Sequence, residues 1–551
     1  MKKLRLFGFS ILMAASMQAN AQWVTDLTVN TPICSASKIQ SEPSIIPDGV
    51  GGAYMVWKDY RNLNTPDAFL QRVNKDGIQV WIVDGLNLVT NPQDQSTPRI
   101  VSDGNYGVIA VWSDFRNGTD RDIFAQRVDS SGIIQWTYNG TLVVGKTTRE
   151  YNERIISDGQ GGAIIAWEQG NTGSIDVWAQ RIDANGVPMW DTNGIALTTA
   201  FANKTLPRMV LSPDSMIYFV WQDNRNGQSD IYAQKMDLAG NRMWGNAAKP
   251  VINATDQQTE PRLVLTENGY GIYVAWVDRR LGFGNQDIFA QKLDSAGTRK
   301  WVPSGVPLVM AANNQNAVDI TTTNKYKNGF VATWRDYRVN AGTSDVYAQK
   351  IDSLGVVKYA TDGIVIANAS GDQLNAQIAQ DTNGGVIIAW QDKNGGNSNL
   401  RAQKLDTAGV AQWGNYADIS TAVGEQQNPQ IIADGEDGLI CVFEDIKDTA
   451  NQNIFAQRLR KGGRFIPTSV TNFQDMQVAV YPNPFTSFVT VTTNTTANID
   501  CKVLDMMGRE VASNITKANN ALQVEVKATA GIYFLQLKAE GRVHVVKVVK
   551  E

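Results

Sequence analysis

The sequence predicts an all-β protein, an eight-bladed β-propeller followed by a small Ig-like β-sandwich. Three observations lead to this prediction. A unit of 53 to 58 residues recurs eight times, every unit holds four short strand-like segments between glycine- and aspartate-rich turns, and the chain changes to a simple alternating pattern near residue 478. Strand repeats of this length are typical of propeller blades, each of which is one four-stranded sheet.

Two residues mark each repeat. A tryptophan, replaced by phenylalanine in the last repeat, ends an apolar segment, and a glutamine follows 13 to 15 residues later. The tryptophan positions are Trp57, Trp112, Trp167, Trp221, Trp276, Trp334, Trp390 and Phe443, and the glutamines are Gln71, Gln126, Gln180, Gln234, Gln291, Gln349, Gln403 and Gln457. The apolar segment, GGAIIAW at 161–167 for example, needs cover on both faces. Sheets stacked around an axis provide that cover.

Two other repeat architectures compete with this interpretation. An open solenoid would need polar capping repeats at its ends, and neither end has one. A seven-bladed ring with one degenerate unit is disfavoured because all eight units keep the glutamine. The segment 23–34 resembles the one that begins at Trp81, whereas the last repeat stops at Phe465 without such a tail. We therefore expect the N-terminal segment to pack on the eighth blade and seal the ring.

The composition excludes several classes of function. A formal net charge of −4 argues against binding to nucleic acid or to an anionic membrane. A single histidine, His544, leaves little room for a histidine-based triad or zinc site, so we expect neither metal nor cofactor. Cys34, Cys441 and Cys501 have no metal-like spacing, and free buried thiols are favoured over a Cys34–Cys441 bridge at ring closure.

The N-terminus has the pattern of a secretory signal peptide. Basic residues at 2–5 precede a short apolar run and an Ala-Asn-Ala site at 19–21, so residues 1–21 are expected to be removed. No later segment is long and apolar enough to be read as a membrane-spanning helix. The predicted order is then a propeller at 22–466, a linker at 467–477 and a separate domain at 478–551.

A polar loop with the pattern D-x-R-N-G follows the tryptophan in most repeats. An arginine four residues after the tryptophan usually accompanies a second aspartate before the next strand, as with Arg116 and Asp122. Paired carboxylates would suit glycoside hydrolysis or calcium binding. A feature spread around the ring is better explained as a structural brace, and we expect the arginine to pair with that second aspartate.

This loop, followed by D-I-Y/F, resembles TolB-type and other periplasmic or surface propellers over about ten residues per repeat. The S-x-D-x-G-x-x-W box of sialidase-like propellers is absent. The tryptophans at fixed register are interpreted as core between blades. Ligand candidates are therefore residues that break the register: Tyr60, Phe115, Glu168, Phe283 and Tyr337.

The C-terminal segment carries a more specific resemblance. VYPNPF at 480–485, VLDMMGREV at 503–511, AGIYFLQL at 530–537 and KVVK at 547–550 occur in the order found in type A sorting domains of type IX secretion. The resemblance implies Sec-dependent export, recognition of the tail at the outer membrane, and its removal on release or on attachment to lipopolysaccharide. The motif positions carried over are Tyr481, Pro482, Asn483, Pro484, Gly508, Arg509, Gly531 and Tyr533. They are structural or recognition positions, not catalytic ones.

These observations predict a secreted or surface-displayed propeller that acts as a non-catalytic binding or adhesion scaffold for a glycan or protein ligand. The type IX machinery is the expected partner of the tail. One alternative is a secreted polysaccharide hydrolase with acidic residues from different blades at the propeller mouth. Another is a structural component of surface or gliding machinery. The sequence names neither the ligand nor the functional face.

Overall fold

The computed structural model describes residues 23–62, 65–171, 173–282, 284–323, 328–394, 396–448, 451–465, 478–493, 499–505, 509–518, 521–539 and 542–551. The chain divides into two compact units, Met1–Pro467 and Thr468–Glu551. All regular elements in the described ranges are β-strands. Those ranges contain no helix with the length and apolarity needed to cross a membrane. The predicted signal peptide and linker lie outside the described residues.

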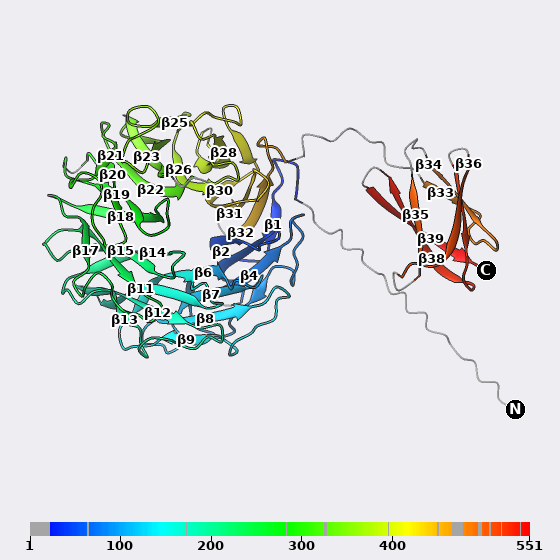
Figure 1. The fold of residues 1–551 in the computed structure, drawn as a ribbon, viewed down its shortest axis with the longest axis horizontal. Coiled ribbons are helices and arrows are strands. Elements are labelled where there is room, and N and C mark those ends of the chain that lie inside the picture. The colour runs from blue at the N-terminus through cyan, green and yellow to red at the C-terminus, as the bar shows by residue number, and fades with distance from the viewer. Residues whose placement is uncertain are drawn as a thin grey trace. The chain divides into compact units, whose positions relative to one another are not determined.

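The described part of the first unit contains eight four-stranded sheets arranged around an axis (Figure 1). The strands next to the axis are β2 (Gln40–Pro47), β6 (Gln95–Ser102), β10 (Glu150–Ser157), β14 (Lys204–Leu211), β18 (Gln258–Leu265), β22 (Gln315–Thr322), β26 (Gln373–Gln380) and β30 (Glu425–Ala433). The second strands are β3 (Ala53–Asp59), β7 (Val108–Asp114), β11 (Ala163–Asn171), β15 (Ile217–Asp223), β19 (Ile272–Asp278), β23 (Phe330–Asn340), β27 (Val386–Asp392) and β31 (Leu439–Asp448). The third strands are β4 (Asp67–Val73), β8 (Asp122–Val128), β12 (Ser174–Ile182), β16 (Asp230–Met236), β20 (Asp287–Leu293), β24 (Thr343–Ile351), β28 (Asn399–Leu405) and β32 (Asn451–Leu459). The outer strands are β5 (Leu86–Asn87), β9 (Thr141–Val144), β13 (Ile195–Ala196), β17 (Lys249–Ile252), β21 (Val306–Val309), β25 (Ile364–Ala367), β29 (Ala417–Ser420) and β1 (Thr31–Cys34). The all-β prediction is confirmed, and the repeated four-stranded sheets are consistent with a propeller.

The core lies between neighbouring sheets, where the second strands are covered on both faces. All seven marker tryptophans and Phe443 are completely buried, as the sequence predicts. Trp112 packs with Tyr54 and Leu70 of the preceding sheet, so its large side chain belongs to the contact between two sheets. Its indole Nε1 donates to Asp114 Oδ2 at 2.9 Å. The buried ring nitrogen therefore keeps a hydrogen-bond partner, as a buried tryptophan needs.

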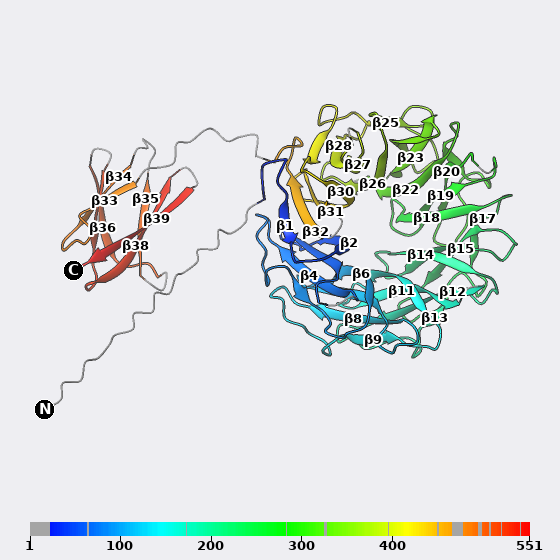
Figure 2. The ribbon, with the colours of Figure 1, turned by 180° about the vertical axis from the view of Figure 1, so that it is seen from behind.

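The N-terminal segment completes the last sheet, as the tail-like sequence predicts. β1 pairs with β32, with Thr31 opposite Ala456 (Figure 2). Trp23 reaches the first sheet, where its Nε1 donates to the Lys75 carbonyl at 2.9 Å. A side chain at Gly77, which has φ 84°, would lie 2.7 Å from the indole, so the glycine leaves room for Trp23. Trp244 makes the equivalent contacts with the Ser295 carbonyl and Gly297 between two internal sheets.

The second unit contains a four-stranded and a three-stranded sheet. The first consists of β33 (Val478–Tyr481), β34 (Val489–Thr493), β37 (Ala521–Val526) and β36 (Ser513–Ala518), and the second of β35 (Asp500–Leu504), β38 (Gly531–Ala539) and β39 (Arg542–Lys550). Apolar residues of both sheets, including Val491, Val503 and Leu535, share one buried core. Cys501 is buried here, and Cys34 and Cys441 are buried in the first unit. All three are free thiols.

Replacing Trp23 by alanine tests whether the N-terminal segment seals the ring. We expect Trp23→Ala to lower the free energy of unfolding by about 3–5 kcal/mol, because it empties a buried site between the last and first sheets. Trp244→Ala is the matched control at an internal contact between sheets. Denaturant unfolding measures both variants. An unfolding free energy unchanged in Trp23→Ala and reduced in Trp244→Ala would contradict closure by this segment.

Candidate functional site

Each of the eight strands next to the axis contains one β-bulge. The pairing of that strand with its neighbour shifts register once, between Ser96 and Arg99 in β6 for example. The residue inside the bulge has a left-handed backbone in every sheet although it is never glycine: Glu42 (φ 56°), Thr97 (51°), Asn152 (55°), Leu206 (55°), Glu260 (54°), Ala317 (52°), Asn375 (52°) and Asn428 (53°). Such a backbone costs about 1–2 kcal/mol per residue, so the surrounding structure must hold it.

Hydrogen bonds between neighbouring sheets help to hold the bulge. At three places in the described residues, the residue after the marker tryptophan or phenylalanine accepts the backbone N–H of a bulge residue in the next sheet. Glu168 Oε1 accepts from Leu206 at 2.8 Å, and Glu444 Oε1 accepts from Glu42 at 2.8 Å. Gln222 makes the same contact with Glu260 at 2.9 Å. Glu168, a ligand candidate from the sequence, therefore lies in a buried link between sheets.

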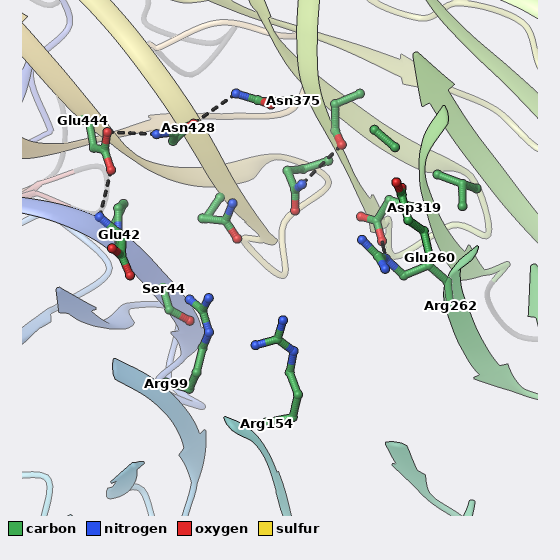
Figure 3. Close-up of a pocket in the computed structure, with 16 residues that line it drawn as sticks. Glu42, Ser44, Arg99, Arg154, Glu260, Arg262, Asp319, Asn375, Asn428 and Glu444 are labelled. Atoms are coloured by element: carbon green, nitrogen blue, oxygen red, sulfur yellow. Dashed lines mark hydrogen bonds and ion pairs between the residues drawn. The ribbon is translucent and has the colours of Figure 1, made fainter. Parts of the chain in front are cut away.

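The bulges surround a polar cavity of about 540 Å³ (Figure 3). Residues of seven of the eight strands next to the axis line it, together with Glu444 of β31. The lining is made of charged, amide and small side chains, and none of the 16 lining residues is aromatic or histidine. A cavity of this size is large enough for a small ligand, and its lining favours hydrogen bonds and charge over stacking.

The positive charge of the cavity comes from the position two residues after the left-handed bulge residue. Around the ring this position is occupied by Ser44, Arg99, Arg154, Arg208, Arg262, Asp319, Gln377 and Gln430. Four successive sheets have arginine at this position. Arg99, Arg154 and Arg262 line the cavity, whereas Arg208 is not among its lining residues. Arg262 Nε lies 3.8 Å from Asp319 Oδ1, whereas no ion pair of Arg99, Arg154 or Arg208 occurs within the described residues. We call these four residues the arginine arc.

Burial and the neighbouring Arg99 lower the pKa of Arg154 to about 10. Burial, followed by repulsion from Arg154, lowers the pKa of Arg208 well below its usual value. A guanidinium with a pKa of about 10 remains protonated at neutral pH. The arc is therefore a group of mutually repelling cations, a geometry that favours an anion.

Three of the four carboxylates that line the cavity, Glu42, Asp319 and Glu444, have side-chain partners. Glu42 Oε1 lies 3.3 Å from Lys58 Nζ. Glu444 is 2% exposed, and its Oε2 accepts from Asn428 Nδ2 at 2.9 Å. Burial raises the pKa of Glu444 and of Asp319. Among the described residues, no group of three or more histidine, cysteine, aspartate or glutamate side chains is placed to hold a metal ion.

The aromatic ligand candidates do not line this cavity. Tyr60, Phe115 and Tyr337 are half-buried. Tyr60 and Phe115 directly follow β3 and β7, and Tyr337 lies within β23. Lys58 Nζ lies 5.5 Å from the centre of the Tyr60 ring, and the Arg335 guanidinium donates to the Tyr337 hydroxyl at 3.1 Å. Phe283 lies outside the described residues. The sequence analysis missed the arginine arc, although Pro-Arg at 98–99, 207–208 and 261–262 was a visible signal.

The repeated polar loop braces each sheet, but with a different partner from the one expected. Arg116 Nη2 lies 2.5 Å from Asp114 Oδ2 and donates to the Asn139 carbonyl at 2.8 Å. Its guanidinium lies 3.5 Å from the centre of the Phe124 ring. Asp122 instead accepts from Asn117 Nδ2 at 3.1 Å. The predicted Arg116–Asp122 pair is wrong, because the arginine turns back over the aromatic ring onto the aspartate that also holds the tryptophan.

In sheets that lack the loop arginine, other side chains pair with the aspartate two residues after the marker position or with the aspartate that precedes the third strand. Arg401 of β28 pairs with Asp392 and, at 3.1 Å, with Asp418. In the last sheet, Asn30 from the N-terminal segment donates to Asp445 Oδ2 at 2.7 Å. In the third, Lys204 Nζ lies 3.1 Å from Asp176 Oδ1. The polar loops are therefore a distributed structural feature and no single site.

A second cavity of about 360 Å³ lies beside the seventh sheet. Trp390, Asp392, Asn415 and Tyr416 are among its lining residues. The Trp390 Nε1–H, which is buried, has no hydrogen-bond partner within the described residues, because Asp392 Oδ2 is paired with Arg401. This cavity lacks the convergent charge of the axial one.

The motif residues of the second unit have mainly structural contacts. Asn483 Oδ1 accepts the Val549 N–H at 2.8 Å, and the Tyr533 hydroxyl donates to the Thr529 carbonyl at 2.7 Å. Arg509 Nε donates to Asp505 Oδ2 at 2.8 Å. Pro482 and Pro484 flank Asn483, Gly531 begins β38, and the Tyr481 side chain is 53% exposed. Gly508 lies outside the described residues.

Comparison with known families places one part of the chain. Residues 479–551 match the secretion system C-terminal sorting domain. The protein is therefore exported by type IX secretion to the cell surface or the medium, as the four motifs predict. No curated protein matches the chain.

Solved structures resemble the chain only distantly. A protein of unknown function from Dyadobacter fermentans has 11% identity and a TM-score of 0.36, covering 57% of this chain and 95% of its own. An endo-arabinase from Bacteroides thetaiotaomicron has 13% identity and a TM-score of 0.28, covering 50% and 98%. A polysaccharide lyase has 12% identity and a TM-score of 0.39, covering 81% and 93%. Likeness at this level assigns no activity.

A double-mutant cycle distinguishes the two possible partners of Arg116. We expect Arg116→Ala to couple with Asp114→Asn by about 1–3 kcal/mol, because the pair is largely buried. Arg116→Ala and Asp122→Asn should be additive within about 0.5 kcal/mol. Urea unfolding of the single and double variants measures both coupling energies. Stronger coupling of Arg116 to Asp122 than to Asp114 would contradict the contact described here and support the Arg116–Asp122 pair predicted from the sequence.

The stability of the third sheet should depend on pH through Glu150. Most sheets pair a glutamine at the start of the first strand with the aspartate of the second strand, as Gln95 with Asp114. In the third sheet an acid and an amide exchange these places, with Glu150 opposite Gln169. Burial, with Asp122 nearby, raises the pKa of Glu150 to about 8. A raised carboxyl pKa means that the folded state binds more protons, so this group reduces stability as pH rises from about 4 to 8. We expect Glu150→Gln to flatten the loss of stability over this range. Thermal unfolding across pH measures it, and an unchanged slope would contradict the raised pKa.

Proposed function

We propose that this exported protein is a non-catalytic binding scaffold whose ligand occupies the axial cavity. We infer that the eight sheets are the blades of one closed propeller, that the loops share their design with TolB-type and surface propellers, and that the tail is an Ig-like sandwich. The cavity is the observation that carries the binding role. Strands from around the ring contribute polar side chains to it, so the ring assembles one site from many repeats.

The distribution of carboxylates favours binding over hydrolysis. A glycoside hydrolase needs one carboxylic acid that can give up a proton and one carboxylate that stays available as base or nucleophile. Glu444 is committed to links between strands, Asp319 faces Arg262, and Glu42 faces Lys58. Each of these groups has a structural partner that would have to be lost before it could act.

A hydrolase remains the second candidate because carboxylates of different sheets share this cavity. Glu42, Glu260, Asp319 and Glu444 all line it. If one of them acts as acid or base, Glu260→Gln is the sharpest test, since Glu42, Asp319 and Glu444 have side-chain partners whose loss would disturb the fold.

Filling the cavity tests the binding proposal. The wild type and the double variant Ser44→Trp/Gln377→Trp are applied to a printed array of neutral and acidic oligosaccharides. We expect the wild type to bind and the double variant to lose binding, because the two indoles occupy the ligand's space. Leu354→Trp, at a position 80% exposed, is the matched surface control and should bind normally.

The fate of the bound oligosaccharide separates the two candidates. Its recovery at unchanged length after incubation supports a scaffold. Shortened products that disappear with Glu260→Gln would replace the scaffold with a hydrolase. Binding that survives both tryptophans would place the ligand site outside the cavity and contradict the proposal.

A further inference from the structure

The charge of the axial cavity is concentrated on one side of the ring. Arg99, Arg154, Arg208 and Arg262 come from β6, β10, β14 and β18, which are four successive strands next to the axis. In Figure 3 the side chains of Arg99 and Arg154 point into the cavity, with Ser44 beside Arg99 and with Arg262 next to Asp319 on the other side of the view. We propose that the arginine arc is an oxyanion site and that the ligand of this cavity carries carboxylate or sulfate groups. This inference rests on the proposed function of the cavity as the binding site.

The repeats themselves show that the fold does not require these arginines. The other four sheets place Ser44, Asp319, Gln377 and Gln430 at the same position and form the same bulge. A residue needed to hold the sheets together, such as the marker tryptophan or the glutamine, recurs around the whole ring. Arginine at four adjacent positions and nowhere else in the register is therefore a local feature.

Several arginines that brace the sheets of this protein have aspartate partners. On the third strands, Arg72, Arg127 and Arg458 lie 2.8 to 2.9 Å from Asp48, Asp103 and Asp434. In the arc only Arg262 has such a partner, and that contact is long at 3.8 Å.

The arc residues are oriented without being neutralised. The guanidinium groups of Arg154 and Arg208 donate to the carbonyls of Glu153 and Pro207, each at 3.0 Å. Glu153 itself is completely buried and accepts from the Thr97 hydroxyl. Arg99 and Arg154 therefore bring positive charge to the cavity without an ion pair to any carboxylate of the described residues.

Electrostatics then favours an anion between these groups. Like charges in a partly buried cavity repel each other more strongly than in water, and the lowered pKa of Arg154 and of Arg208 agrees with this. An oxyanion among several guanidinium groups replaces that repulsion with charge-assisted, often bidentate hydrogen bonds. A concave wall of one sign also concentrates anions of small size near it.

The rest of the lining narrows the ligand class. Ser44, Gln377, Asn428 and Gln430 offer hydrogen bonds opposite or beside the arc, and no aromatic lining residue provides a surface for stacking a neutral sugar. An acidic saccharide, with hydroxyl groups for the amides and carboxylate or sulfate groups for the arginines, fits this pattern. A free inorganic oxyanion shares the same charge chemistry, so the experiment must separate the two.

Calorimetric titration of the whole chain with three probes makes this separation. Sodium sulfate represents the free oxyanion, trigalacturonate the acidic saccharide, and maltotriose a neutral saccharide with the same number of rings. We expect trigalacturonate to bind, to weaken as NaCl is raised, and to exceed maltotriose in affinity by at least about tenfold. Sulfate binding without trigalacturonate binding would also support the oxyanion site and would identify the free ion as its ligand.

Variants of the arc test whether these arginines are responsible. Arg99→Gln and Arg154→Gln should each weaken binding by about tenfold or more, and Arg154→Lys by less, because it keeps the charge but loses the fork. Arg127→Gln, which removes an arginine paired with Asp103 outside the cavity, is the matched control and should leave the affinity unchanged. Melting without ligand gives a second readout. Arg154→Gln should melt at the same temperature as the wild type or higher because repulsion is relieved, whereas Arg127→Gln should melt lower.

Two outcomes would overturn the inference in different ways. Maltotriose binding that is lost in Ser44→Trp/Gln377→Trp but is matched by no anionic probe would reject the oxyanion site and keep the cavity as the binding site. No binding of any probe here, together with no cavity-dependent binding on the oligosaccharide array, would reject both proposals.

Discussion

The burial of both faces of the second strand is the constraint on which the first unit depends. A strand such as β7, whose seven residues are all buried, cannot exist in an isolated four-stranded sheet with one face in water. Each sheet therefore depends on its two neighbours for stability, and the first sheet must pack against the last to bury the faces that would otherwise be exposed. The completely buried tryptophans, each between two sheets, contribute much of this stability. Closure by β1 and Trp23 supplies the contact that a linear array would lack.

The same constraint determines where function can develop. Buried tryptophan, glutamine and aspartate positions are occupied by interactions that recur from sheet to sheet. When one sheet loses a partner, another residue takes its place, as Arg401 does for Asp392 and Asn30 for Asp445. The positions that vary freely are those next to the axis, beyond the bulge. Because seven of the eight strands next to the axis bring these positions to one cavity, changes at a few of them produce one concentrated site.

The bulge connects backbone geometry with this site. A left-handed residue in each strand next to the axis is unfavourable locally, and it is held by the strand pairing and by links such as Glu168 to Leu206. The residue two positions later then faces the cavity in several sheets. Arginine there is exposed to other arginines and to few carboxylates, which is unfavourable for an empty protein and favourable for one that holds an anion. Stability and binding therefore make opposite demands on the arc.

The sequence by itself determined the repeat, the all-β class, the packing on the last sheet by residues 23–34 and the sorting motifs, because these depend on periodicity and on short contiguous patterns. It could not determine which aspartate Arg116 contacts. Asp114 and Asp122 both lie close along the chain, and only the position of the Phe124 ring and the Asn139 carbonyl decides between them. It also could not show that Arg99 and Arg262, 163 positions apart, belong to one cavity. That convergence depends on the ring and on the bulge that turns each side chain toward the axis, and both are properties of the tertiary structure alone.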